Sequence, residues 1–160
     1  MKSKILIIIA LLCLIGFCSC DNGPGGNPTE PNNPFAGTKW KLVGTFDSET
    51  NEFITEADRK DLLWGYTLKF YVDSVVGCSS GNRLTGLYKC NFSSKSFEFV
   101  NFGSGTTAGE TNFGFFYVKT IKEIQSFYLK NEKLRLYYND KKNYFLYEQL
   151  SQLILPGESE

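Results

Sequence analysis

The residues that could do chemistry in this chain are few, and cysteine is the most informative of them. The 160 residues include five cysteines and no histidine. Without imidazole, Ser-His-Asp and Cys-His catalytic arrangements and a two-histidine zinc helix are excluded. No two acidic residues lie in an apolar sequence context that would raise a carboxyl pKa for acid–base work. We therefore expect a protein that binds rather than catalyses, with no catalytic residues, no metal site and no cofactor.

The N-terminus predicts export and a lipid anchor. Two lysines precede an apolar run over residues 5–15, and the segment ends in Ser19-Cys20. A basic start, a short apolar stretch and a small residue before the cut are typical of a secretory signal, and a membrane-spanning helix needs about 20 apolar residues. The segment resembles a bacterial lipobox, which implies a signal peptide over 1–19 and lipidation of Cys20. The alternative is an ordinary signal peptide with an accidental cysteine.

These features predict a lipoprotein of the outer membrane of a Gram-negative bacterium, on its periplasmic face or at the cell surface. Residues 20–34 are rich in Pro, Gly and Asn and predict a flexible tether. Residues 35–152 form the expected domain, and 153–160 a C-terminal tail. Two of the 17 basic residues lie in the signal peptide, so the mature chain carries a net charge of −2. This charge gives no reason to expect a nucleic-acid partner.

Cys78 and Cys90 remain in the mature domain, and in an exported protein such a pair predicts a disulfide. A loop of this length would contribute about 3 kcal/mol if closed without strain. Tetrahedral metal coordination would need further Cys or His ligands. Two reduced, buried thiols are the other alternative.

Alternation of apolar and polar residues with a period of two dominates the domain and predicts half-buried antiparallel strands. The apolar positions are Trp40 and Leu42; Tyr66, Leu68, Phe70 and Val72; Phe127 and Leu129; and Leu134, Leu136 and Tyr138. Further strands are expected near 84–92, 96–102 and 144–150, and hairpin turns at 131–132 and 140–143. Because closure removes exposed sheet edges, we predict a mainly β fold, an antiparallel β-barrel or rolled sheet of seven to eight strands with one helix.

Two segments depart from the strand pattern. Residues 56–63 are charged and predict one or two helical turns over a barrel mouth. In residues 110–124 the apolar positions follow a helical stripe, although Gly114 and the neighbouring β-prone aromatics favour a strand. We predict that this segment is the helix.

Three segments together resemble the META/HslJ heat-shock domain family. Thr38-Lys39-Trp40-Lys41-Leu42-Val43 is similar to its first strand, Gly77-Cys78 with Gly86-Leu87-Tyr88 to its central motif, and 126–136 to its closing strand pair. The chain departs from the family at Ser79, where an Asn is usual, and it lacks the cysteine expected after residues 106–109. The resemblance implies a compact β-barrel with one helix and without catalytic residues.

The plan of a lipid anchor, a tether and one barrel is also similar to the potempins, which are membrane-anchored peptidase inhibitors. This likeness implies a protein partner, a co-exported peptidase, bound through loops at the barrel rim. An envelope stress or maintenance lipoprotein is one alternative function, and a glycan-binding surface lipoprotein is another.

Two Gly-rich stretches are the candidate contact loops. In the loop over 77–86, Arg83 and Leu84 are the side chains that we expect to reach a peptidase pocket. The loop over 103–112 offers Ser104, Thr106 and Thr107. A solvated connection and a stapled barrel rim are the structural alternatives for these two loops.

Two further predictions concern glycans. The aromatic content of 16% exceeds what one barrel core obviously requires, and Tyr71, Tyr128 and Tyr137 fall on the water-facing phase of their strands. Exposed tyrosines can stack on sugar rings, although tyrosine is also simply a good strand former. Asp73-Ser74-Val75 resembles a bacterial O-glycosylation signal, so Ser74 is a candidate modification site.

Overall fold

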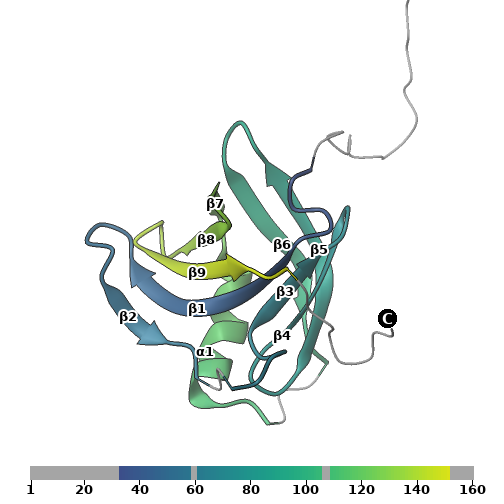
Figure 1. Ribbon diagram of the computed structural model, residues 1–160, viewed down its shortest axis with the longest axis vertical. Coiled ribbons are helices and arrows are strands. Elements are labelled where there is room, and N and C mark those ends of the chain that lie inside the picture. Colours follow the sequence, from purple (N-terminus) through teal and green to yellow (C-terminus); the bar gives the residue numbers. More distant parts are fainter. Residues whose placement is uncertain (1–32, 59–60, 106–108, 152–160) are drawn as a thin grey trace, which may run out of the picture.

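One antiparallel sheet of nine strands accounts for most of the chain (Figure 1). The computed structural model describes residues 33–58, 61–105 and 109–151. Eight strands close into a barrel through the pairing of β1 with β9, and β2 adds to β1 outside that ring. The strands are β1 (Lys39–Asp47), β2 (Phe53–Glu56), β3 (Thr67–Phe70), β4 (Ser74–Cys78), β5 (Arg83–Asn91), β6 (Ser96–Gly103), β7 (Ser126–Lys130), β8 (Lys133–Tyr138) and β9 (Asn143–Gln149). The predicted mainly β barrel with one helix is confirmed.

The alternation in the sequence matches the two faces of the barrel wall. Trp40, Leu68 and Leu134 are at most 1% exposed, as their positions on the apolar phase predict. Val72 departs from its pattern and is 57% exposed, because β3 ends at Phe70 and the chain turns there. The turn expected between β7 and β8 lies at Asn131-Glu132, where both residues adopt positive φ.

The predicted long loop over 77–86 is wrong. β4 runs to Cys78 and β5 begins at Arg83, so residues 79–82 form the connection. The glycines that look like loop signals lie inside strands instead. A Cβ at Gly77 would meet the carbonyl oxygen of Thr67, and one at Gly86 would lie 2.6 Å from the Cα of Phe102. These glycines allow neighbouring backbones to approach closely.

The helix lies where the stripe predicts it. α1 (Asn112–Thr120) continues into a 3-10 turn, η1 (Ile121–Glu123). Tyr117, Ile121 and Ile124 point into the core and are at most 3% exposed. The helical turns expected over 56–63 are wrong in the described part of that segment, because Glu56 ends β2 and no residue of 57–58 or 61–63 is helical.

Aromatic rings fill the barrel interior. Phe35 is fully buried and lies within 6.2 Å, between ring centroids, of five other rings. These rings belong to Phe70, Tyr88, Phe92, Phe97 and Phe127. Phe35 therefore plugs the end of the barrel at which the described chain begins. The high aromatic content is largely a property of this core.

The predicted disulfide between Cys78 and Cys90 is wrong. Neither cysteine is in a disulfide, and the strand register explains why. Cys78 pairs with Arg83, and Cys90 lies seven residues further along β5. Seven residues of strand span about 23 Å, whereas bridged cysteines have Cα atoms within about 7 Å. Cys78 packs against Trp64 and Leu150 on the outside of the wall, while Cys90 packs against the interior core.

Candidate functional site: a cleft at the barrel mouth

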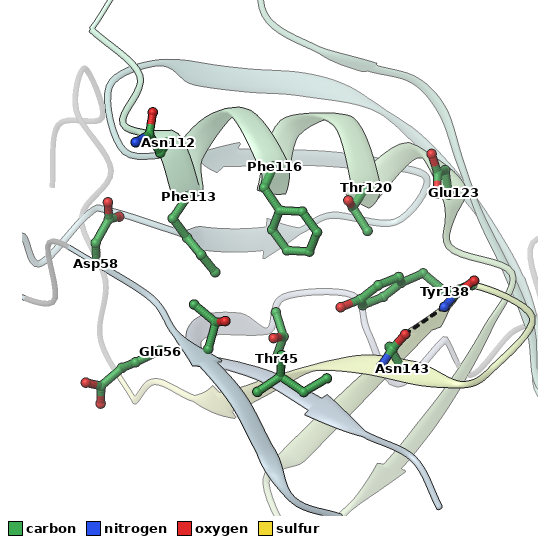
Figure 2. A pocket seen from close by; sticks show the side chains of 13 residues that line it. Thr45, Glu56, Asp58, Asn112, Phe113, Phe116, Thr120, Glu123, Tyr138 and Asn143 are labelled. Carbon is green, nitrogen blue, oxygen red and sulfur yellow. Dashed lines mark hydrogen bonds between the residues drawn. The ribbon is translucent and has the colours of Figure 1, made fainter.

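A cleft of about 840 Å³ lies between β2 and α1 (Figure 2). We call it the mouth cleft. It is lined by Thr45, Ile54, Thr55, Glu56, Asp58, Asn112, Phe113, Phe116, Thr120, Glu123, Tyr138, Asn139 and Asn143. The lining thus combines three carboxylates, three carboxamides, four hydroxyl groups and an apolar wall.

β2 forms one side of the mouth cleft, because it pairs with β1 outside the closed ring of strands. β1 is long enough to pair with β3 over its first half and with β2 over its second half. The β1–β2 register shifts between Thr45 and Phe46, so Ile54 is an extra residue on β2. Phe53 packs on Phe46 with ring centroids 5.1 Å apart, which holds β2 in place.

The opposite side is α1, and a polar network fixes its N-terminus. The Thr111 side chain caps the helix by accepting from the Gly114 backbone N–H at 2.9 Å. The Glu110 carboxylate accepts hydrogen bonds from the Ser79 hydroxyl, from Ser80 Oγ at 2.5 Å and from Asn82 Nδ2 at 2.6 Å. The β4–β5 connection therefore holds the start of the helix against the barrel.

Aromatic rings form a continuous wall along the mouth cleft. Phe113 and Phe116 lie 5.7 Å apart between centroids, and Phe116 lies 6.3 Å from Tyr138. Figure 2 shows both phenylalanines directed from the helix toward Thr45 and the strands below. Burial raises the pKa of the Tyr138 hydroxyl, and its hydrogen bond with Thr45 opposes that shift. Tyr138 is therefore a neutral hydrogen-bonding group at physiological pH.

The carboxylates lie at the two ends of this wall. In Figure 2, Glu56 and Asp58 lie at one end, and Glu123 lies at the other. Asp58 accepts a hydrogen bond from the Tyr66 hydroxyl, whose oxygen is 3.1 Å from Thr111 Oγ1. Burial, followed by the contact with Asp58, raises the pKa of Tyr66 well above its ordinary value. Tyr66 stays protonated and links the acidic end of the cleft to the helix cap.

Exposed apolar side chains contribute to the lining of the mouth cleft. Two apolar residues of the lining are exposed to solvent: Ile54 on β2 by 50% and Phe116 on α1 by 39%. Single exposed apolar residues are ordinary, but a group of them around a hollow is typical of an interaction site.

Among the contact residues predicted from the sequence, Leu84 is wrong: its side chain is fully buried in the core. Arg83 is exposed, but it begins β5 rather than occupying a loop tip. Ser104 lines a second, shallower hollow on the wall between β5, β6 and η1. Thr106 and Thr107 lie outside the described residues.

The tyrosines proposed for glycan stacking do not form one row. Tyr71 follows β3, whereas Tyr128 and Tyr137 lie on the adjacent strands β7 and β8. Tyr71 and Tyr128 are 38% and 45% exposed, and Tyr137 is half-buried beside Tyr144. Ser74, the candidate glycosylation site, is half-buried at the start of β4. Cys20 lies outside the described residues.

Sequence reasoning missed the mouth cleft, because its residues come from five segments. Four consecutive residues of β2 carry too short a pattern to mark a strand, and Ile54 breaks the alternation. The helical stripe over 110–124 was a usable signal, since it placed Phe113 and Phe116 on one helix face. Nothing in the sequence pattern paired that face with Glu56 or Asp58.

Two other kinds of feature are absent from the described ranges. No group of three or more Cys, Asp or Glu side chains there is arranged to hold a metal ion. No helix in the same ranges has the length and apolar character needed to cross a bilayer.

The fold is a small closed β-barrel capped by one helix. Two solved structures share this fold. One is a DUF4847 family protein from Bacteroides vulgatus ATCC 8482, with a TM-score of 0.57 and 13% identity over 74% of this chain and 96% of that one. The other is a protein from Burkholderia xenovorans, with a TM-score of 0.54 and 17% identity over 81% of this chain and 98% of that one. No family model and no curated protein matches the sequence.

Proposed function

We propose that this chain is a non-catalytic binding lipoprotein, anchored in the outer membrane through Cys20, which captures a protein partner at the mouth cleft. The single observation that carries the proposal is the cleft with its exposed apolar rim on β2 and α1. Exposed apolar side chains at a hollow favour a macromolecular partner over open solvent.

The position of the mouth cleft relative to the tether supports this function. Asn33, at the end of the predicted tether, hydrogen-bonds through its side chain to the Val72 carbonyl and the Tyr88 hydroxyl. In Figure 1 the segment over 33–38 (purple) lies beside β5, whereas β2 and α1 lie at the other end of the barrel. An anchored domain would therefore present the cleft away from its attachment point.

The most concrete form of the proposal is inhibition of a co-exported peptidase. With Leu84 in the core, the proposed contact surface moves from the β4–β5 connection to the mouth cleft, and the loop predicted over 103–112 stays a second candidate. The full chain, purified in mild detergent, should inhibit at least one metallo-, serine or cysteine peptidase of its own secretome at micromolar concentration. If all three classes stay fully active, the partner is not a peptidase.

Site-directed photo-crosslinking tests the proposed function itself. The photoreactive residue p-benzoylphenylalanine replaces Ile54 or Phe116 in the full chain in its native cell, and replaces Glu98 on the exposed wall as the control. We expect a discrete protein adduct from both cleft positions and none from position 98. Absence of an adduct at both cleft positions, or an equal adduct from the control, would contradict the proposal.

A second candidate, glycan binding, is favoured by one observation on the outer wall. Phe53, Phe46, Tyr144 and Tyr137 lie opposite one another across β2, β1, β9 and β8; Phe53 is 49% exposed, whereas Tyr144 is buried beneath its neighbours. Arg135 lies over the Tyr144 ring at 4.7 Å and beside Tyr128. Loss of polysaccharide retention on Tyr128→Ala and Tyr137→Ala, with retention intact in Phe116→Ala, would support this function.

A further inference from the structure

We infer that the outer wall of the barrel over β7, β8 and β9 binds a carboxylate-bearing sugar, of the uronic acid class, at Arg135 and Tyr128. This inference rests on the second candidate function, glycan binding, and names the class of sugar. It concerns a surface separate from the mouth cleft, since neither residue belongs to the lining of that cleft.

Arg135 supplies a cation that is fixed in position. Its guanidinium lies over the Tyr144 ring, with Cζ 4.7 Å from the ring centroid, and Nη1 donates to Asn51 Oδ1 at 3.2 Å. The Tyr144 hydroxyl donates to the same Asn51 oxygen at 3.3 Å. Because these contacts already orient the guanidinium, little ordering remains to be done when a ligand binds.

The charge of Arg135 has no acidic partner in the described part of the chain. The neighbouring Lys133 is paired with Glu148 at 3.5 Å, whereas Arg135 forms no ion pair with any residue of the described ranges. A guanidinium carries several N–H donors and recognises a carboxylate through parallel hydrogen bonds. The contact with Asn51 occupies one of these donors, so others remain for a ligand carboxylate.

Tyr128 supplies an apolar ring beside that cation. It lies directly opposite Arg135 in the β7–β8 register, is 45% exposed, and has its ring centroid 6.0 Å from Arg135 Cζ. An exposed tyrosine ring can stack on the C–H face of a sugar. A ligand of the size of one sugar ring can contact both groups. An acidic sugar uses the ring and the charge together, whereas a neutral sugar or an acidic peptide uses only one of them.

Further aromatic rings extend this surface beyond Arg135. Successive ring centroids are 5.5, 5.3 and 5.1 Å apart along the row of Tyr137, Tyr144, Phe46 and Phe53, which crosses β8, β9, β1 and β2. Tyr144 is buried beneath its neighbours, and Phe53 at the end of the row is 49% exposed. Four adjacent strands span about 14 Å. We therefore expect an oligosaccharide to bind more tightly than a monosaccharide.

Labelled oligosaccharides test this inference. The probes are fluorescent tetrasaccharides of galacturonic acid and of mannuronic acid, each compared with its carboxyl-reduced counterpart, in which a neutral hydroxymethyl group replaces every carboxylate. Binding to the full chain in detergent is followed by fluorescence anisotropy. We expect at least one acidic tetrasaccharide to bind about tenfold more tightly than its reduced counterpart, and the preference to shrink as salt screens the charge.

The possible failures are distinguishable. Equal binding of the acidic and reduced forms, or tighter binding of the reduced form, would refute the acidic sugar while leaving glycan binding standing. No binding of any tetrasaccharide would contradict both. A glutamate heptapeptide that binds as tightly as the acidic tetrasaccharides would show that the surface selects charge alone, which would also overturn the inference.

A matched pair of variants assigns the preference to this surface. Arg135→Gln should give the acidic and reduced forms equal affinity, and Lys89→Gln, which removes a cation from the exposed face of β5, should leave the preference intact. Tyr128→Ala should weaken both forms alike, because it removes the ring and keeps the charge. If Arg135→Gln does not fold, Arg135→Lys keeps the charge without the planar fork and should reduce the preference. A preference that survives the Arg135 change, or is lost in Lys89→Gln, would contradict the proposed site.

Discussion

At the scale of single residues, Phe35 shows how one side chain closes the barrel. It is the first residue after the predicted tether, and its ring is fully buried among five other rings. The turn that carries it is tied to the wall, since the Gly37 N–H donates to the Phe70 carbonyl at 2.9 Å. The core of the barrel therefore includes the first residue that follows the predicted tether.

Phe35→Ala should lower the free energy of unfolding by about 3–5 kcal/mol, because it removes a buried ring and leaves a cavity. Urea denaturation monitored by tryptophan fluorescence measures the change. Phe115→Ala is the matched control: its ring is 51% exposed, and we expect a change within about 0.5 kcal/mol. Equal stability of the two variants would refute the role of Phe35 as a plug.

The two cysteines of the domain should remain thiols in the purified protein. Burial raises the pKa of the Cys78 thiol, so this group should react with iodoacetamide only after denaturation. Intact-mass measurement before and after reduction should show no difference. A mass increase of two hydrogens on reduction, or a peptide linking Cys78 to Cys90, would contradict the register of β4 and β5.

At the scale of elements, the start of α1 is the part of the mouth cleft that packs most closely on its neighbours. Gly114 packs so closely on the β4–β5 connection that an added Cβ would meet Ser80 Oγ and Glu110 Oε2. Alanine favours helices by about 1 kcal/mol over glycine. The steric contact and the intrinsic propensity therefore act in opposite directions at this position.

Gly114→Ala should destabilise the protein by about 1–3 kcal/mol, because the contact with Ser80 and Glu110 outweighs the gain in helix propensity. Thermal unfolding of the two proteins measures the difference. Gly105→Ala serves as the control, since a Cβ there has no neighbour within 4 Å. A more stable Gly114→Ala variant would show that the helix start is not packed against the β4–β5 connection.

Much of the element layout could be predicted, for a physical reason. Each long strand has one apolar face, so the alternation at Trp40 and Leu42 or at Leu134 and Leu136 marks a strand directly. The mouth cleft could not be predicted, because it depends on a bulge at Ile54 and on how far β1 extends past β3. The glycines at 77 and 86 led to the wrong prediction of a long loop, because the close approach of neighbouring strands leaves no signal in the local sequence.

At the scale of the whole molecule, buried tyrosine hydroxyls set the alkaline limit of stability. Burial raises the pKa of Tyr88 to about 12, and it also raises those of Tyr66, Tyr117 and Tyr147. The Tyr147 hydroxyl donates to that of Tyr117 at 3.0 Å inside the core. These groups stay protonated in the folded state while their unfolded counterparts ionise near pH 10.

The contribution of these tyrosines to the free energy of unfolding should therefore be constant below about pH 10. It should fall as the pH rises toward 12. The folded state holds more protons than the unfolded state in that window, so the free energy of unfolding decreases with pH. Urea midpoints between pH 8 and 11.5 measure the slope, and Tyr88→Phe should make it shallower. A midpoint that rises or stays flat above pH 10 would contradict the burial of these hydroxyls.

The central claim is that the partner binds at the mouth cleft, and amide hydrogen exchange tests it most directly. Exchange of the full chain is followed with and without a saturating concentration of the protein partner that the crosslinking experiment identifies. We predict slower exchange over 53–56 in β2 and over 112–116 in α1, with no change over 89–98 on the opposite side of the molecule. Protection confined to 89–98, or spread evenly over the barrel, would contradict the claim.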